Sequence, residues 1–443
     1  MTVLVISPDY ASHALPLIRL AGAWRDAGER VVVATGPAVA PLVAQAGMQI
    51  VRLAVGRGSN PGVARPEQQP PGEDDNLRAF FEATRHGMVP TLRYQAEARG
   101  RDLLWEPVET ARRTIEIVQA VQPDVIVVDH LAFGATIGLR AIGVPYADVV
   151  LGHPRQLPVA GETYGVPSAW PISISPGSIE LSDLLSIARR VSARFTGAYN
   201  DALRVVSGGS VSVDDAFAAH GSLVLLNYPR ALHDRRRTAE LPPAHAFLGA
   251  MPHNEPASAE VDAWLDRDPD RPLVLVSLGT FLSARDDVLA TIAQGLRRLD
   301  VRVALATGST EPTRLGSLPP EWLVDAYLPQ VSILQRASAL VTHAGNNSVT
   351  EAVAHGVPMF ALPFSTDQFD GAAAIEMGGL GLAADPNRVG PAEVADAVQR
   401  IIDLPHPALD HLSDELAGRH GAGIAREAVG EWLGGSRQSV GSR

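Results

Sequence analysis

Short apolar runs separated by amphipathic stretches recur along most of the chain. The apolar runs fall at 3–6, 30–35, 124–129, 273–277, 302–307, 339–343 and 358–363. Each run is almost continuous rather than alternating, which is typical of parallel strands buried on both faces. The stretches between them gather apolar residues on one helical face, as Leu17, Leu20 and Trp24 do. The repeated order strand, helix, strand predicts α/β architecture with doubly wound parallel sheets.

The two halves of the chain resemble each other. RVVVATG at 30–36 recurs as RVALATG at 302–308. VVDHLAFGATIGLRAIGVP (127–145) and LVTHAGNNSVTEAVAHGVP (340–358) share the order strand, His, loop, helix, Gly-Val-Pro. The repetition predicts two similar Rossmann-like domains that face each other across a cleft, rather than one large sheet.

The predicted division follows the proline-rich segment that separates the halves. Residues 1–225 form a first domain, 226–255 an interdomain linker and 256–433 a second domain, whose last helix can pack back on the first. Residues 434–443, GGSRQSVGSR, have the composition of a disordered tail.

Composition and charge narrow the class of protein. Of the 443 residues, 46% are hydrophobic and 19% are charged, which is enough apolar material for two cores. The net charge of −12 argues against a nucleic-acid partner, because phosphate binding needs a basic surface. Cysteine is absent, and no apolar run is long enough for a membrane span. The start, MTVLVISPDY, reads as a strand rather than a signal peptide, so we expect a cytoplasmic protein without a membrane partner.

The stretch VTHAGNNSVTEAVAHGVP at 341–358 carries more polar residues than a strand-to-helix turn needs. A helix that starts near 346 offers backbone N–H groups and a positive dipole end, which suit a phosphate. His343 and Ser348 can add donors, and Gly345 lets the backbone approach closely. Glu351, one turn along, can accept hydrogen bonds from a ribose. Each residue alone also fits an ordinary capped helix with a Ser348/Glu351 capping box.

Residues 322–374 resemble the donor-binding signature of the UDP-sugar glycosyltransferases that act on small molecules and have the GT-B fold. The motifs are YLPQ (327–330), HAGNNSVTE (343–351), GVP (356–358) and DQ (367–368), in family order and spacing. The resemblance implies contacts to the donor diphosphate by His343, Asn347 and Ser348, and to the ribose by Glu351. It further implies that Tyr327 and Gln330 hold the base, that Asp367 and Gln368 hold sugar hydroxyls, and that Thr280 touches the β-phosphate. Tyr327 and Asn346 stand where plant members carry Trp, so the resemblance leaves the contact made by Asn346 open.

A candidate base lies near the N-terminus, in SHALPL (12–17). We expect Ser12 to cap the following helix, Pro16 to lie in its first turn, and His13 to project from the loop into the cleft. The family places its catalytic His at this position and pairs it with an Asp that corresponds to Asp129. Asp9 is a second candidate for that carboxylate.

The resemblance implies an inverting, metal-independent transferase without a cofactor. It would move a sugar from a UDP- or dTDP-sugar to a hydroxyl, or another nucleophile, of a small-molecule acceptor such as an antibiotic. We expect a monomer or homodimer, with the acceptor bound by loops in 56–105 and 152–215. A nucleotide-sugar 2-epimerase, a lipid-acceptor glycosyltransferase and a non-catalytic helper of the same fold are the alternatives. A dinucleotide dehydrogenase fits less well, because SPDYAS (7–12) lacks the Gly-x-Gly-x-x-Gly turn.

Overall fold

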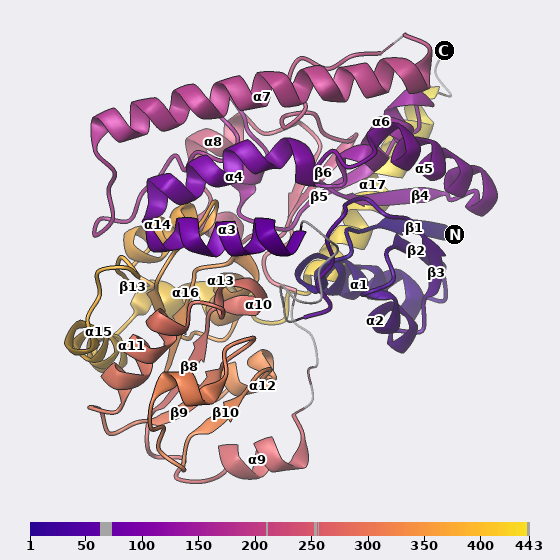
Figure 1. Ribbon diagram of the computed structural model, residues 1–443. Coiled ribbons are helices and arrows are strands. Elements are labelled where there is room, and N and C mark those ends of the chain that lie inside the picture. The colour runs from indigo at the N-terminus through magenta and orange to yellow at the C-terminus, as the bar shows by residue number, and fades with distance from the viewer. Residues whose placement is uncertain (63–72, 210, 252–254, 256, 441–443) are drawn as a thin grey trace.

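Two parallel β-sheets, each covered by helices, make up the molecule (Figure 1). The computed structural model describes residues 1–443 apart from 63–72, 210, 252–254, 256 and 441–443. All strand pairs given within the two sheets are parallel. The predicted α/β class and the two Rossmann-like domains are therefore confirmed.

The first sheet has seven strands in the order β3-β2-β1-β4-β5-β6-β7. Their bounds are β1 Thr2–Ile6, β2 Arg30–Thr35, β3 Gln49–Arg52, β4 Val125–Asp129, β5 Ala147–Val150, β6 Leu223–Leu226 and β7 His245–Phe247. The second sheet has six strands in the order β10-β9-β8-β11-β12-β13. They are β8 Leu273–Ser277, β9 Arg302–Ala306, β10 Leu323–Asp325, β11 Ala339–Thr342, β12 Met359–Ala361 and β13 Gly381–Ala383.

The internal repetition of the sequence appears as a repeated local topology. β1 lies between β2 and β4, and β8 lies between β9 and β11 in the same way. Both sheets bury both faces: Val3 and Val5 belong to one core cluster, and Leu4 and Ile6 to the cluster on the other side. Burial on both faces is the reason that these strands are continuously apolar.

The helices of the first domain pack on the sheet through apolar stripes. On α1 (Ala11–Asp26), the residues Leu17, Leu20 and Trp24 are fully buried. The others are α2 Ala40–Gln45, α3 Glu73–Arg85, α4 Met88–Asp102, α5 Pro107–Val121, α6 Phe133–Ala141, α7 Ser178–Ser207 and α8 Arg235–Ala239. The segment 226–255, predicted as a linker, contributes α8 and β7, and β7 extends the first sheet. With only three residues, β7 is too short to give an apolar run, so the hydrophobic pattern did not predict this strand.

The second domain carries α9 Ala259–Leu265, α10 Gly279–Leu282, α11 Asp286–Leu296, α12 Gln330–Leu334, α13 Asn346–Ala354, α14 Gln368–Met377, α15 Pro391–Asp403 and α16 Pro407–Leu416. The last helix, α17 (Gly421–Val440), returns to the first domain, where Ala425 and Val429 join the core beside α1 (Figure 1). Helix thus continues to Val440 through most of the predicted disordered tail, and 441–443 lie outside the described residues.

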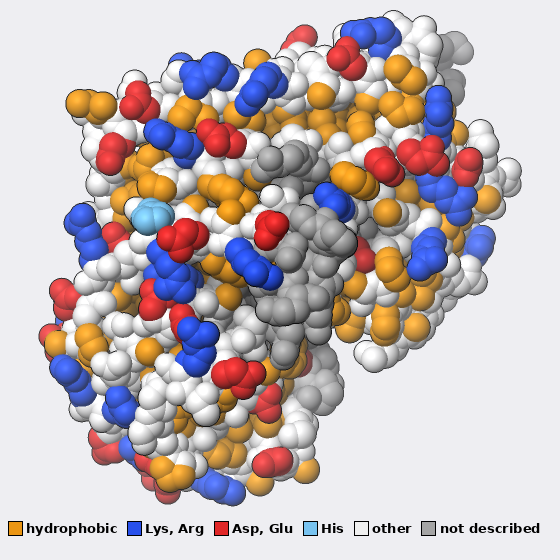
Figure 2. Space-filling model, viewed as in Figure 1, with side chains coloured by type: hydrophobic (Ala, Val, Ile, Leu, Met, Phe, Trp, Pro, Cys, Tyr) orange, Lys and Arg blue, Asp and Glu red, His pale blue; other side chains and the backbone are white. Residues whose placement is uncertain are grey.

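The described surface mixes both signs of charge. On the face shown in Figure 2, arginines are interspersed with Asp and Glu over both domains. In the part of the chain that the structure describes, no helix is long and apolar enough to cross a membrane.

Candidate active site

A cavity of about 1090 Å³ lies between the two domains, beyond the carboxyl ends of strands from both sheets. This is where doubly wound sheets bind their ligands. Eleven of the predicted site residues line it: His13, Tyr327, Gln330, His343, Gly345, Asn346, Asn347, Ser348, Glu351, Asp367 and Gln368. Thr280 lies in α10, and its side chain is outside the described part of the structure.

His13 lies in the first turn of α1, not in a loop as predicted. The helix begins at Ala11 with Tyr10 as its N-cap residue, so Ser12 is already inside it. The amides of His13 and Ala14 both donate to the carbonyl of Tyr10. The helical backbone therefore fixes the direction in which His13 enters the cavity.

His13 is paired with the buried carboxylate of Asp129 at the end of β4. The distance from His13 Nδ1 to Asp129 Oδ2 is 2.8 Å, and the side chains are 24% and 1% exposed. The second oxygen, Oδ1, accepts from the Leu131 amide at 2.9 Å. Since an ionised carboxylate only accepts, Nδ1 carries the hydrogen and Nε2 keeps a lone pair. Burial is the largest single influence on the pKa of His13 and would lower it, but the charge and hydrogen bond of Asp129 and the charge of Asp367 together raise this pKa.

Asp9, the other candidate for this partner, has a different task. Its two carboxylate oxygens accept from the amides of Ala38 and Val39 at 3.1 and 3.0 Å. These amides precede α2, so Asp9 holds the loop at the start of that helix. The structure brings Asp129, not Asp9, to His13.

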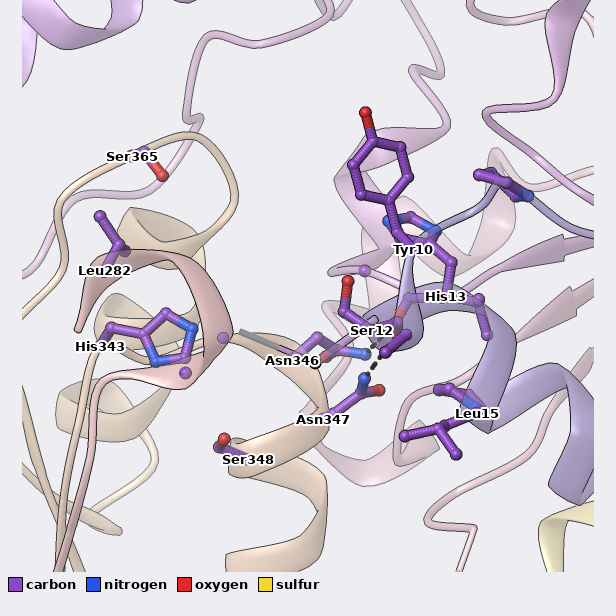
Figure 3. A pocket seen from close by; sticks show the side chains of 18 of the residues that line it. Tyr10, Ser12, His13, Leu15, Leu282, His343, Asn346, Asn347, Ser348 and Ser365 are labelled. Atoms are coloured by element: carbon purple, nitrogen blue, oxygen red, sulfur yellow. Dashed lines mark hydrogen bonds between the residues drawn. The ribbon is translucent and has the colours of Figure 1, made fainter. Parts of the chain in front are cut away.

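Pro16 leaves an acceptor free for the second domain. A proline inside a helix has no N–H for the carbonyl four residues earlier, which here belongs to Ser12. Asn347 Nδ2 from α13 donates to that carbonyl at 3.2 Å (Figure 3). Pro16, three residues after His13, thus leaves the Ser12 carbonyl available for a hydrogen bond between the two domains.

Asn346, whose role the sequence left open, also ties the domains together. Its Nδ2 donates to the carbonyls of Leu151 and Asn227 at 2.8 and 2.7 Å, and the residue is 8% exposed. Asn227 Nδ2 donates in turn to Asn347 Oδ1 at 3.0 Å. The first turn of α13 is therefore held against the first domain by side-chain amides.

His343 lies on the other side of the start of α13 from His13 (Figure 3). Its ring fits between two glycines: a Cβ on Gly279 would lie 2.7 Å from Cε1, and one on Gly345 would lie 2.3 Å from Nε2. Gly345 is thus needed to make room for the imidazole. Burial lowers the pKa of His343 to about 4, so this group is a neutral hydrogen-bonding imidazole at neutral pH.

Glu351, one turn further along α13, is held by residues from both domains. Gln330 Nε2 donates to its Oε2 at 2.7 Å and to Ser348 Oγ at 3.2 Å. Arg19 Nη1, from α1, contacts Oε1 at 3.2 Å. Burial raises the pKa of Glu351, and the charge of Arg19 opposes that rise. Sequence reasoning did not identify Arg19.

Tyr327 stands 56% exposed at the rim of the cavity. Its hydroxyl donates to Glu255, whose other oxygen accepts from the Val331 amide at 3.1 Å, at the start of α12. Glu255, which the sequence analysis also missed, thus joins the aromatic ring to α12.

Asp367 and Gln368 line the cavity with their polar groups already engaged. Asp367 Oδ2 accepts from the His153 amide at 2.9 Å, across the domain boundary. Gln368 Oε1 accepts from the amides of Phe364 and Ser365 at 3.0 and 3.2 Å. One helical turn on, Asp370 accepts from the Ser168 and Ala169 amides of the first domain.

The remaining wall is mainly apolar and comes from the first domain. Leu77 and Phe80 of α3, Tyr94 of α4, Leu103 and Tyr164 line this part. The predicted segments 56–105 and 152–215 both contribute to it, through loop residues such as Gly56, Pro61 and Tyr164 as well as through α3 and α4. Among the described residues, no group of three or more His, Asp and Glu side chains is placed to hold a metal ion.

Comparison with known proteins agrees with this geometry. Residues 223–408 match the family model of "UDP-glucoronosyl and UDP-glucosyl transferase". The chain is 27% identical over 444 residues to the L-demethylnoviosyl transferase of Streptomyces niveus, covering 97% of both chains. It is 26% identical to the 4'-demethylrebeccamycin synthase of Lentzea aerocolonigenes, over 72% of this chain and 76% of that one. The crystal structure of glycosyltransferase VinC in complex with DTDP matches with a TM-score of 0.67 at 19% identity, covering 98% of each chain.

The family match covers the β6-to-α16 region that holds every predicted donor-site residue, and the relatives extend over the cavity wall of the first domain. The chain is therefore a glycosyltransferase with the GT-B fold, and its residues 223–408 are similar to the UDP-glucoronosyl and UDP-glucosyl transferases.

Proposed function

We propose that the protein transfers a sugar from a UDP- or dTDP-sugar to a hydroxyl of a small-molecule acceptor, with inversion and without a metal ion. One observation carries the proposal. A single cavity joins His13, paired with Asp129 in the first domain, to His343 and the N-terminus of α13 in the second. A base and an anion-binding helix end are the two groups that such a displacement requires.

His13 acts as the base. With Nδ1–H donated to Asp129, the lone pair on Nε2 takes the proton of the acceptor hydroxyl, and Asp129 stabilises the imidazolium that forms. The acceptor oxygen then bonds to the anomeric carbon from the side opposite the diphosphate. The bond from this carbon to the diphosphate oxygen breaks, its electron pair leaves with the diphosphate, and the configuration inverts.

The leaving diphosphate is met by α13. Backbone amides and the dipole at the start of this nine-residue helix favour negative charge. Neutral His343 and Ser348 add hydrogen-bond donors rather than full charges. Preorganised donors that face the developing charge lower the barrier without rearranging during the reaction.

The acceptor proposal follows from the apolar wall. Leu77, Phe80, Tyr94 and Leu103 suit a mostly apolar aglycone that presents a hydroxyl to His13. The names of the relatives, a demethylrebeccamycin synthase and a demethylnoviosyl transferase, support an acceptor of the secondary-metabolite type.

The test combines a donor and acceptor screen with one substitution. Mass spectrometry of nucleotide sugars with candidate aglycones should find a glycosylated product, and His13→Ala should reduce its formation by about a hundredfold or more. Thermal stabilisation by UDP or dTDP should persist in His13→Ala, and His411→Ala, an exposed histidine on α16, should behave as wild type.

Three results would count against the proposal. Near-normal turnover by His13→Ala removes this residue as the base. No stabilisation of the wild type by UDP or dTDP contradicts the donor site. A changed nucleotide sugar in the absence of any acceptor favours the epimerase alternative.

A further inference from the structure

Two helices from different domains meet along the donor side of the cavity. Ser12, Leu15, Pro16 and Arg19 lie three or four residues apart on α1, so they share one face, and all of them line the cavity. Opposite them, α13 presents Asn347 and Glu351, also four residues apart.

The two helices are joined at both ends of this face. Asn347 Nδ2 donates to the Ser12 carbonyl at 3.2 Å, and Arg19 Nη1 donates to Glu351 Oε1 at 3.2 Å. The helix that carries His13 is thereby aligned with the helix that carries the nucleotide-binding residues (Figure 3).

The Arg19–Glu351 pair is largely withdrawn from water, with side chains 20% and 10% exposed. Burial raises the pKa of Glu351, and Glu255 from the interdomain segment adds to that rise. Arg19 is the cation that opposes it among the described groups, and Gln330 adds a neutral donor. Tyr327 and Glu255 are the other titratable groups that face Arg19, whose own pKa is lowered by burial.

The Glu351 carboxylate can accept further hydrogen bonds from a ligand beside those from Arg19 and Gln330. Each oxygen of an ionised carboxylate accepts two hydrogen bonds. Arg19 takes one position on Oε1 and Gln330 takes one on Oε2, so a position remains on each oxygen for the hydroxyls of a nucleoside sugar. If Glu351 were protonated, one of these accepting positions would be lost, and the remaining hydrogen bonds to the sugar hydroxyls would no longer be strengthened by the negative charge.

We propose that Arg19 is a positioning residue of the donor site supplied by the first domain. It keeps Glu351 ionised and oriented for the hydroxyls of the nucleoside sugar, so that the nucleotide site is complete only when the two domains are closed. The inference rests on the proposed function, because it assigns Glu351 to the nucleoside sugar. Binding of the nucleotide and alignment of His13 with the donor then become one event.

The test measures nucleotide binding alone, so it needs no acceptor. UDP and dTDP are titrated calorimetrically into wild type, Arg19→Ala and Arg19→Lys. Arg25→Ala is the matched control, because this arginine lies on the same helix, 41% exposed, and does not line the cavity. Arg19→Ala should bind UDP about tenfold or more weakly near neutral pH, as expected for losing a hydrogen bond to a charged group.

The pH profile separates this role from a merely structural one. Without Arg19, no cation opposes the burial that raises the pKa of Glu351, so the affinity of Arg19→Ala should increase as the pH rises. Wild type and Arg19→Lys, which keep a cation beside the carboxylate, should change much less. In a Glu351→Gln background, Arg19→Ala should have little further effect, because the two residues act as a unit.

The outcomes distinguish the two proposals. If wild type binds neither UDP nor dTDP, the proposed function fails. If wild type binds and Arg19→Ala matches Arg25→Ala at every pH, only the role of Arg19 is overturned. Should Arg19→Ala fail to fold, Arg19→Gln keeps a polar, partly shortened side chain without the charge and tests the same prediction.

Discussion

Arg285 connects α3, which lines the cavity, to the second domain, and its removal should loosen α3. This arginine is 1% exposed and precedes α11 in the second domain. Its guanidinium donates to Asp287 through Nε and Nη2, to Asn387 through Nη2, and to the carbonyl and hydroxyl of Thr84 through Nη1, over 2.7 to 3.2 Å. Thr84 lies on α3, which belongs to the first domain by sequence and lines the cavity.

The cost of Arg285→Ala can be estimated from these partners. Breaking a buried, hydrogen-bonded charge pair costs roughly 3–5 kcal/mol when the remaining charge stays buried. Asp287 is 45% exposed, so water can solvate it after the substitution, whereas the Thr84 carbonyl loses one of its two donors and keeps Asn387 Nδ2. We therefore expect about 3 kcal/mol, which corresponds to a decrease in Tm of roughly 5–10 °C for a domain of this size.

The assay is thermal denaturation together with hydrogen exchange of α3. Arg285→Ala should lower the Tm and the protection of the α3 amides, while the central strands keep theirs. Arg388→Ala, an exposed arginine next to Asn387, is the control. Arg285→Lys should restore little, because the three donors of an ammonium cannot replace the five hydrogen bonds that the planar guanidinium makes. A Tm within about 1 °C of the control, with α3 still protected, would refute the reasoning.

Two further predictions concern buried carboxylates. Asp129→Asn removes a charge that raises the pKa of His13, so the fall in activity at low pH should move to lower pH. The rate should decrease by up to about a hundredfold. An unchanged pH–rate profile would contradict the pairing. Asp370 contacts Arg155 across the domains at 3.1 Å, and burial raises its pKa from 3.8 to about 7. Between these two pKa values the folded state binds more protons than the unfolded state. The contribution of protonated Asp370 to the free energy of unfolding is therefore fully present below about pH 4 and is lost as the pH rises through about 7. Asp370→Asn should therefore gain stability relative to wild type over that window, by up to about 4 kcal/mol, and parallel pH–stability curves would contradict it.

The apolar pattern predicted the interior strands β1, β2, β4, β8, β9, β11 and β12 because both of their faces are buried. It missed β6, although all four of its residues are buried. It also missed β3, β7, β10 and β13, which have three or four residues and are mostly half-exposed or exposed at or near the sheet edges. Such strands need no continuous apolar run, so the sequence carries little signal for them. The helical wall made by α3 and α4 was also missed.

The motif residues could be placed at the cavity because strand ends in parallel sheets converge on one edge. Arg19, Glu255 and Asn227 could not, because each acts on residues far away in the chain. Arg19 and Glu351, for example, are 332 residues apart. The only local signal for Arg19 was its helical spacing from Ser12 and Pro16, which becomes informative once α1 is known to begin at Ala11.

The polar residues at the start of α13 fall into two groups: some face the cavity, and others form hydrogen bonds with the first domain. His343, Ser348 and Glu351 line the cavity. Asn346 donates to two carbonyls of the first domain, and Asn347 donates to the Ser12 carbonyl that Pro16 cannot engage. A large aromatic ring at 346 would lose both of the buried hydrogen bonds that the amide makes. The residue that departs from the plant pattern is therefore suited to holding the domains together, directly beside the groups that are proposed to receive the diphosphate. The start of α13 thus contacts the first domain and also carries the groups that are proposed to receive the diphosphate. A movement of the first domain relative to the second should therefore change the proposed anion site.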